Sequence, residues 1–282
     1  MGDSVGTVIT GECRYGTMSF LRHDLTIGRS LRDYGEWAQA EVDSLLRGIP
    51  PGGMVWDVGA NVGTHTLAFA RRVGPSGRVY AFEPQRTLFE LLRTNVERNG
   101  LSGICRLLDT GLADAPGEMV VPTLDYARPS HPGGVALLPA SPGSAGERVR
   151  VTTLDLCRPD ACDLIKVDVE GMELQVLTGA RATLSRFRPL VSIECWSVEA
   201  GWPNMCLMRD LGYRTFACSF PGFNPSNYRL NPDDWFHGAG EPALLFVPEG
   251  RVAAAEGMLA GLRGEPVESR EQLRLALSPP AG

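Results

Sequence analysis

The feature that most constrains the fold is a short turn between a predicted apolar strand at 54–59 and a predicted helix at 64–73. Four residues at alternate positions define this turn: Asp57, Gly59, Asn61 and Gly63. The glycines let the backbone turn sharply and approach a ligand closely. The helix that follows offers free N–H groups at its N-terminus. The turn therefore indicates a nucleotide-like ligand at the end of a strand.

Strands and helices alternate along most of the chain after this turn. The further strands are predicted at 78–82, 104–108, 163–168, 189–195, 213–216 and 243–247, and the helices at 85–99, 173–184 and 204–211. Strands that alternate with helices of this length predict βαβ units. The expected fold class is therefore α/β, with a doubly wound parallel sheet that carries helices on both faces.

The 282 residues are enough for one large α/β domain with additions. We expect an N-terminal extension over 1–50, a main domain over 51–250 and a helical tail over 251–282. A segment rich in Pro, Gly, Ser and Ala, at about 122–148, is read as a surface insertion. Its flanks, 118–121 and 149–152, are expected to pair as a hairpin.

The extension is predicted to contain a strand at 17–21 and an amphipathic helix at 34–46. Tyr34, Glu36 and Trp37 are candidates for a lid over the ligand, and Trp37 has core packing as an equal alternative.

Composition narrows the partners and the location. The net charge of −6 disfavours bulk binding to nucleic acid or to an anionic membrane, because both need a basic surface. No apolar run approaches the roughly 18–20 residues that cross a bilayer, and residues 1–10 do not read as a secretory signal. We therefore expect a cytoplasmic protein. The seven cysteines, an odd number without a CxxC pair, disfavour a disulfide framework or a thiolate zinc site.

The spacing of residues in the turn indicates which nucleotide-like ligand it binds. A dinucleotide fingerprint, G-x-G-x-x-G, admits a pyrophosphate, and an anionic Asp57 beside a pyrophosphate would be unfavourable. Beside the ammonium of S-adenosylmethionine the same carboxylate fits well. Glu83 lies at the end of the second strand, 20 residues after Gly63, where an acid accepts hydrogen bonds from both ribose hydroxyls. Asp109 ends the third strand and either accepts the adenine amino group or forms a turn before Gly111.

Acidic residues also gather at the later strand ends. Asp168, Glu170 and Glu173 meet where the strand at 163–168 joins the next helix, and Glu173 is also well placed to favour that helix's N-terminus. Alternation along the strand places Lys166 on the same face as Asp168. Five acids share the strand ends: Asp57, Glu83, Asp109, Asp168 and Glu194. Ligands of open parallel sheets bind at this edge, so the row is hard to explain as solvated surface.

These motifs resemble the FkbM family of S-adenosylmethionine-dependent methyltransferases. The resemblance rests on residues 56–63, 82–84, 153–155, 165–173, 176–177 and 179–180. It implies the Rossmann-like class I methyltransferase fold, a seven-stranded sheet whose last strand is antiparallel. It also implies O-methylation, often of a sugar or an antibiotic-type small molecule. The acceptor itself does not carry over from the family, and neither does the oligomeric state.

Methyl transfer to a hydroxyl needs positioning and a base for the hydroxyl proton. Asp168 is the first candidate and Glu194 the second, with Glu170 beside them as a third catalytic carboxylate. Magnesium bound by Asp168 and Glu194 is the alternative, but it is not favoured because Glu194-Cys195 replaces an Asp-Asn or Asp-Asp pair. We therefore assign no metal ligand.

The remaining candidates are weaker. His65, His131 and His237 are secondary base candidates. The aromatic residues considered for an acceptor pocket are Trp196, Trp202, Phe223 and Tyr228, although aromatics in this number are more often core. Two other function classes remain open, an NAD-dependent oxidoreductase and a non-catalytic protein that retains the cofactor site.

Overall fold

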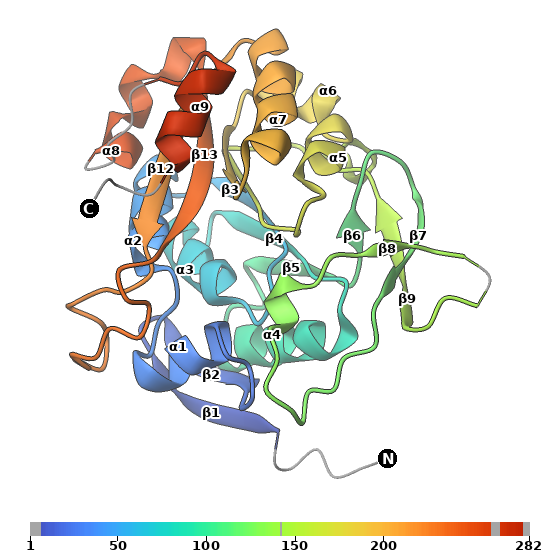
Figure 1. Cartoon of the computed structure of the whole chain (residues 1–282), viewed down its shortest axis with the longest axis vertical. Coiled ribbons are helices and arrows are strands. Elements are labelled where there is room, and N and C mark those ends of the chain that lie inside the picture. Colours follow the sequence, from blue (N-terminus) through green and yellow to red (C-terminus); the bar gives the residue numbers. More distant parts are fainter. Residues whose placement is uncertain (1–6, 142, 261–265, 279–282) are drawn as a thin grey trace.

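A seven-stranded sheet forms the centre of the molecule in the computed structural model, which describes residues 7–141, 143–260 and 266–278 (Figure 1). The strand order is β12-β13-β11-β10-β3-β4-β5. The strands are β3 Met54–Val58, β4 Arg78–Phe82, β5 Cys105–Leu108, β10 Leu164–Val167, β11 Leu190–Glu194, β12 Tyr213–Pro221 and β13 Gly240–Pro248. β13 is antiparallel to β11 and β12, while β3, β4, β5, β10 and β11 pair in parallel. This arrangement confirms the expected fold class, including the antiparallel last strand.

Helices cover both faces of the sheet. The helices α2 Gln39–Gly48, α3 Thr64–Val73 and α4 Arg86–Arg98 contribute to one hydrophobic core, and α5 Glu173–Thr178, α6 Arg181–Phe187 and α7 Val198–Asp210 contribute to the other. In α4 the apolar residues recur at helical spacing, so Leu88, Leu92 and Val96 are buried together. On the opposite face Trp56 stacks against Tyr80 and Phe82 of the neighbouring strand. Each face thus has its own core, which holds the strand ends in fixed positions.

Two helices differ from the sequence prediction. The helix expected over 173–184 is broken into α5 and α6, because the Asp155 carboxylate accepts hydrogen bonds from the backbone N–H groups of Ala182 and Thr183 at 2.9 and 2.8 Å. The helix expected over 204–211 begins earlier, at Val198. There Ser197 serves as the N-cap and its hydroxyl accepts the N–H of Ala200.

The N-terminal extension forms a hairpin and two helices beside the sheet. β1 Val8–Cys13 pairs with β2 Gly16–Leu21, and α1 Ile27–Asp33 precedes α2. The strand expected over 17–21 is confirmed, while β1 was not predicted. The helix expected over 34–46 is present as α2, but it begins only at Gln39. Gly35 and Ala38 have positive φ angles, 72° and 47°, which interrupt the helix.

The insertion and the segments on either side of it form a small second sheet. Its strands are β6 Gly111–Leu112, β7 Gly117–Val121, β8 Leu138–Pro139 and β9 Glu147–Thr152, and a 3-10 turn lies at Pro132–Gly134. β7 pairs with β9 in antiparallel register, which confirms the expected hairpin. Ser130 joins the insertion to the extension, because its N–H donates to the carbonyl of His23 and its carbonyl accepts the N–H of Leu25. Two segments far apart in sequence therefore meet near the end of the sheet.

The C-terminal tail is only partly helical in the part that the structure describes. After the 3-10 turns Glu249–Arg251 and Ala253–Ala255 it contains α8 Glu256–Leu259 and α9 Arg270–Leu277. Residues 261–265 of the expected helix lie outside the described residues. Pro266 and Val267 instead contact β12 as an extended segment, with the Val267 N–H donating to the carbonyl of Thr215.

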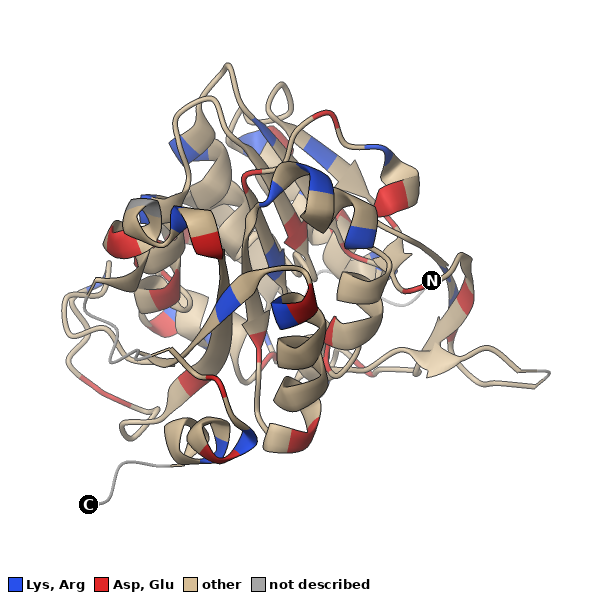
Figure 2. Cartoon of the chain, turned by 90° about the horizontal axis from the view of Figure 1, so that it is seen from above, with Lys and Arg blue, Asp and Glu red and all other residues tan. Residues whose placement is uncertain are grey.

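Two findings bear on the expected partners. Among the helices described, none combines the length and the apolar character needed to cross a membrane. Lys and Arg are scattered among Asp and Glu over many elements, as Figure 2 shows.

Candidate active site

A cavity of about 450 Å³ opens at the carboxyl ends of the parallel strands. Gly59, Glu83, Asp168 and Glu194 line it from the ends of β3, β4, β10 and β11. The N-terminal extension and the insertion cover it with Thr26, Ile27, Trp37, Ala38, Glu41, His131, Gly133, Gly134, Val135 and Leu137. The cavity is therefore built from the edge where open α/β sheets bind ligands.

The glycine turn presses closely against the neighbouring strand. Gly59 has a φ of 83°, and a Cβ added there would collide with the backbone carbonyl of Asp168. The N–H groups of Gly59 and Ala60 both donate to the carbonyl of Phe82, at 3.0 and 2.9 Å. Asn61 also has a positive φ, 51°, and its side chain accepts the N–H of Val62. The turn thus brings backbone, without a side chain, to the floor of the cavity.

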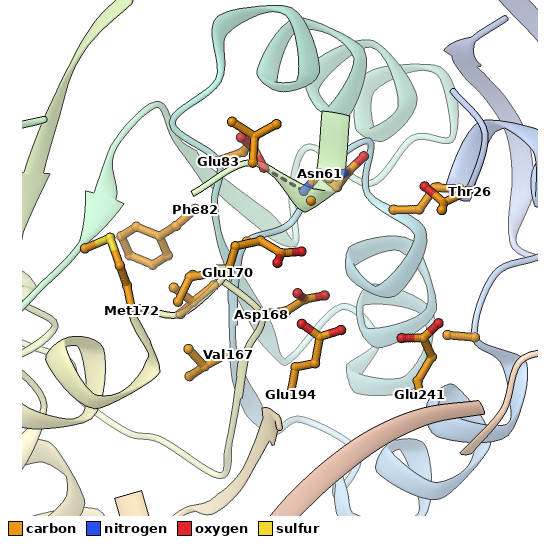
Figure 3. Close-up of a pocket in the computed structure, with 18 of the residues that line it drawn as sticks. Thr26, Asn61, Phe82, Glu83, Val167, Asp168, Glu170, Met172, Glu194 and Glu241 are labelled. Carbon is orange, nitrogen blue, oxygen red and sulfur yellow. Dashed lines mark hydrogen bonds between the residues drawn. The ribbon is translucent and has the colours of Figure 1, made fainter. Parts of the chain in front are cut away.

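Glu83 closes this turn from the adjacent strand. Its Oε2 accepts the N–H of Asn61 at 2.9 Å, the bond drawn in Figure 3, and its Oε1 accepts the N–H of Gln85 at 2.8 Å. Burial raises the pKa of Glu83 to about 7, although these two hydrogen bonds oppose the shift. A carboxylate oxygen has room for a second donor. The position therefore leaves acceptor capacity for ribose hydroxyls, the role that the sequence suggested for Glu83.

Asp57 lies beneath the turn and not on the cavity lining. It is fully buried, and its Oδ2 accepts the Thr66 hydroxyl at 2.6 Å. Its Oδ1 has no hydrogen-bond partner among the described residues and lies 3.9 Å from Lys166 Nζ. Gly63 is likewise absent from the lining and serves as the N-cap of α3. In this structure both residues are part of the turn's framework and do not line the cavity.

Asp109 also lies away from the cavity. Its exposed carboxylate pairs with Arg150 at 3.4 Å. The cavity wall beyond Glu83 is instead built from Phe82, Gln85, Leu112, Val135 and Leu137. Gln85, which sequence reasoning missed, holds the insertion in place because its Nε2 donates to the carbonyl of Pro132.

Three of the predicted carboxylates come together. One oxygen each of Asp168, Glu170 and Glu194 lies within 4.8 Å of the others, and Figure 3 shows them facing a common space. Burial and the nearby Asp168 raise the pKa of Glu170 to about 7 and that of Glu194 to about 9. The same causes raise the pKa of Glu241 to about 7. The carboxylate oxygens of Asp168, Glu170 and Glu194 are also the candidate ligands for a metal ion.

Lys166 supplies the counter-charge beneath the cluster. It is buried, and its Nζ donates to Asp168 Oδ2 at 3.1 Å. Burial alone would lower its pKa, but Asp168, Asp57 and Glu41 raise it above the usual value. The ammonium group therefore holds the Asp168 carboxylate in one orientation.

Two lining acids, Glu41 and Glu241, were not predicted from the sequence. Glu241 is the second residue of an antiparallel strand, and such a strand places its first residues at the edge where its parallel neighbours end. That rule could have identified it. Glu41 lies on α2, and no periodic pattern indicates which way a helix of the extension faces relative to a distant strand end.

The other sequence candidates separate into two groups. His131 and Trp196 line the cavity, whereas His65 is buried and contacts Glu41 at 3.1 Å. Neither His237 nor the aromatic residues Trp202, Phe223 and Tyr228 appear in the lining.

Of the lid candidates, only Trp37 reaches the cavity lining. Tyr34 stacks on Trp235, with ring centroids 5.8 Å apart. The Glu36 carboxylate holds the neighbouring loop by accepting the Asn224 side-chain amide and the backbone N–H of Tyr228. Both residues fasten the loop after β12 to the extension.

Comparison with known proteins agrees with this geometry. The family model of the methyltransferase FkbM domain matches residues 57–215, more than half of the chain. The chain belongs to the FkbM methyltransferase family. The matched range contains the glycine turn, Glu83 and the Asp168 cluster, and membership implies S-adenosylmethionine as the methyl donor.

The chain is also similar to three known methyltransferases. The chain is 29% identical over 203 residues to methyltransferase sdnD of Sordaria araneosa, covering 60% of this chain and 76% of the relative. It is 28% identical over 204 residues to the 31-O-demethyl-FK506 methyltransferase FkbM of Streptomyces tacrolimicus, covering 61% and 77%. It is 30% identical over 140 residues to the hexuronic acid methyltransferase AglP of Haloferax volcanii, covering 45% and 49%.

The residues present fit the cofactor that the family implies. Gly59 offers backbone that no side chain obstructs, and Glu83 offers an acceptor for ribose hydroxyls. The apolar wall of Leu112, Val135 and Leu137 suits a flat base.

Proposed function

We propose that this FkbM-family chain methylates a hydroxyl group of a small molecule, with a sugar or a natural product of the antibiotic type as the acceptor. When bound, the cofactor supplies a methyl group activated on a sulfonium. One observation carries the proposal: Glu83 and Gly59 on the cofactor side open into the same cavity as Asp168, Glu170 and Glu194. A hydroxyl held by these carboxylates would therefore lie within the cavity that holds the methyl donor.

Asp168 is the residue proposed to accept the hydroxyl proton. Its orientation is held by Lys166 at 3.1 Å, and it lies among the other carboxylates. Glu194 suits a different role, because a pKa of about 9 keeps it protonated at neutral pH. As a carboxylic acid it donates a hydrogen bond to an acceptor oxygen. Glu170, with a pKa of about 7, contributes a further acceptor for a neighbouring hydroxyl.

The charge of the cavity restricts the acceptor. Six carboxyl groups line it, and none of its described lining residues is Lys or Arg: the six are Glu41, Glu83, Asp168, Glu170, Glu194 and Glu241. A protonated Glu194 carries no charge, but an anionic acceptor would meet like charge at short range from the carboxyl groups that are ionised. A neutral polyhydroxylated compound or one bearing an amine fits better. The proposed acceptor therefore differs in charge from a hexuronic acid.

Magnesium is a second candidate component of this site, favoured by the closeness of Asp168, Glu170 and Glu194. One contact argues against it. Lys166 Nζ donates to Asp168, so a positive charge already lies beside the position that a divalent cation would occupy. We therefore propose a metal-independent reaction. Full loss of turnover in EDTA, with recovery on adding magnesium, would contradict this.

Calorimetry separates the proposed activity from the two alternative classes. The protein is titrated with S-adenosylhomocysteine and, separately, with NAD. We expect binding of the first and none of the second, and tight NAD binding alone would overturn the proposal. Hydroxylated acceptors, neutral, amine-bearing and acidic, are then screened for methyl transfer, because a non-catalytic protein would bind the cofactor without turnover.

The base is tested on the acceptor found by that screen. We expect Asp168→Asn to lower kcat by roughly 10²–10⁴-fold, with the affinity for S-adenosylhomocysteine little changed. Unchanged turnover at unchanged cofactor affinity would show that Asp168 is not the base.

A further inference from the structure

Glu41 is a largely buried carboxylate in the cavity that the proposed reaction does not use. It projects from α2 of the N-terminal extension. Its side chain has only 13% of its surface exposed, yet it belongs to the lining. A carboxylate that is both buried and open to a ligand cavity is costly unless a partner of opposite charge is near.

The surrounding residues hold Glu41 in one position. Its Oε2 contacts His65 Nε2 at 3.1 Å, and its Oε1 accepts the Ser192 hydroxyl at 3.4 Å. These contacts come from α3, the helix that follows the glycine turn, and from β11. Burial opposes ionisation of Glu41, but His65, Lys166 and Ser192 outweigh it and lower its pKa. Glu41 is therefore a fixed negative charge beside the turn.

Its place along the sheet edge matches one end of the cofactor. Glu83, the proposed ribose acceptor, lies at the end of β4, with the apolar wall beyond it. In the opposite direction from β4, the sheet continues with β3, β10 and then β11, whose Ser192 contacts Glu41. The nucleoside and Glu41 therefore lie on opposite sides of the glycine turn. The amino-acid end of the cofactor, which carries an ammonium group, is the end that would extend toward Glu41.

Asp57, the residue expected from the sequence to bind this ammonium, does not line the cavity in this structure. It has no exposed surface, its Oδ2 accepts the Thr66 hydroxyl, and its Oδ1 lies 3.9 Å from Lys166 Nζ. We infer that Glu41 binds the α-ammonium group of the methyl donor, so that helix α2 of the extension completes the cofactor site. This inference rests on the proposed function, because it takes S-adenosylmethionine as the ligand.

The test compares two ligands that differ only in the amino group. Calorimetry measures the affinity for S-adenosylhomocysteine and for its deamino analogue, in the wild type and in Glu41→Gln. We expect Glu41→Gln to weaken S-adenosylhomocysteine binding by roughly 10- to 100-fold, as for loss of a hydrogen bond to a charged group. The affinity for the deamino analogue should change by less than about threefold, because that ligand lacks the group that Glu41 recognises.

Two further variants keep the test decisive. Asp43→Asn removes a charge from the exposed side of the same helix and should leave both affinities unchanged. Glu41→Asp keeps the charge on a shorter side chain. It should show a reduced preference for the amino ligand, and it replaces Glu41→Gln if that variant fails to fold.

Three results would overturn the inference. Equal weakening of both ligands by Glu41→Gln would show a structural role, and no weakening would show no contact. Selective weakening by Asp168→Asn in place of Glu41→Gln would assign the ammonium to Asp168. If wild-type protein binds neither ligand, the proposed function fails as well. That outcome is distinct, because all three of the other results require normal wild-type binding.

Discussion

The backbone N–H of Asn61 donates a hydrogen bond to Glu83 Oε2 at 2.9 Å. This bond joins the turn after β3 to the end of β4, so the two parts of the proposed nucleoside site form one unit. Because the Gln85 N–H occupies the other carboxylate oxygen, the orientation of Glu83 is set before any ligand arrives. Such preorganisation reduces the entropy lost on binding.

Replacing Glu83 should therefore weaken both folding and cofactor binding. In Glu83→Gln one of the two backbone N–H groups faces an amide NH₂ in place of an oxygen. We expect the free energy of unfolding to fall by roughly 1–3 kcal/mol, measured by urea denaturation at pH 8, and S-adenosylhomocysteine affinity to fall with it. Glu118→Gln, at an exposed pair with Arg148, is the matched control and should cost less than about 1 kcal/mol. Equal losses in the two variants would contradict the proposed role.

The buried cation at Lys166 should be essential for stability. Lys166→Met leaves Asp57 and Asp168 without their counter-charge, and Asp57 remains wholly buried. Removing one partner of a buried ion pair costs roughly 3–5 kcal/mol, which denaturant unfolding would detect. Arg106→Met, at an exposed position on β5, is the comparison and should change stability little. A loss below about 1 kcal/mol in Lys166→Met would show that the charges are solvated or neutralised in another way.

The carboxyl cluster makes stability depend on pH. The folded-state pKa values of Glu194, Glu170 and Glu241 are raised, to about 9, 7 and 7. The folded state therefore holds these protons at pH values where the unfolded chain has lost them. The ordinary pKa of a glutamate side chain is 4.5. By linkage, the contribution of these protons to stability is fully present below pH 4.5 and is lost as pH rises through 7 and then 9.

Thermal unfolding of the ligand-free protein at several pH values tests this dependence. Between pH 6 and 9, Tm should fall more steeply in the wild type than in Glu194→Gln, which has no proton to lose at that position. Glu199→Gln, an exposed acid that pairs with Arg270, should keep the wild-type slope. Identical slopes in all three proteins would mean that Glu194 is ionised in the folded state at neutral pH.

Much of the framework follows from local sequence patterns. α3 and β4 have the predicted bounds, because apolar periodicity and the Gly74-to-Gly77 turn mark their ends. Glu83 and Asp168 also reach the cavity as expected, since a residue that ends a parallel strand lies at the binding edge. These are cases where local patterns decide the outcome.

Other residues depend on contacts that local patterns do not contain. Asp57 is in the expected strand, but alternation of side chains and the hydroxyl of Thr66 direct it beneath the turn. Asp109 turns outward to Arg150, which lies 41 residues later on β9. Glu41 enters the cavity only because α2 packs against α3 and β12. Such placements depend on how the extension and the insertion fold onto the sheet.

The close contact between Gly59 and the Asp168 carbonyl offers the sharpest test of how the turn is built. Gly59 has a φ of 83° and Gly100 a φ of 69°, so an alanine at either position is strained in a similar way. Only at Gly59 would the added Cβ meet another strand, whereas nothing lies within 4 Å of the corresponding position at Gly100. The pair therefore separates backbone strain from the collision.

We expect Gly100→Ala to cost about 1 kcal/mol and to leave S-adenosylhomocysteine binding intact. Gly59→Ala should cost roughly 1–3 kcal/mol more, as overpacking does, and should abolish detectable binding because the Asp168 backbone must move away from the turn. Urea denaturation and calorimetry on both variants measure the two effects. If both variants lose the same stability and both bind the ligand normally, then β3 and β10 can separate freely at this point. Close approach of the turn to β10 would then not be what holds Asp168 beside the cofactor.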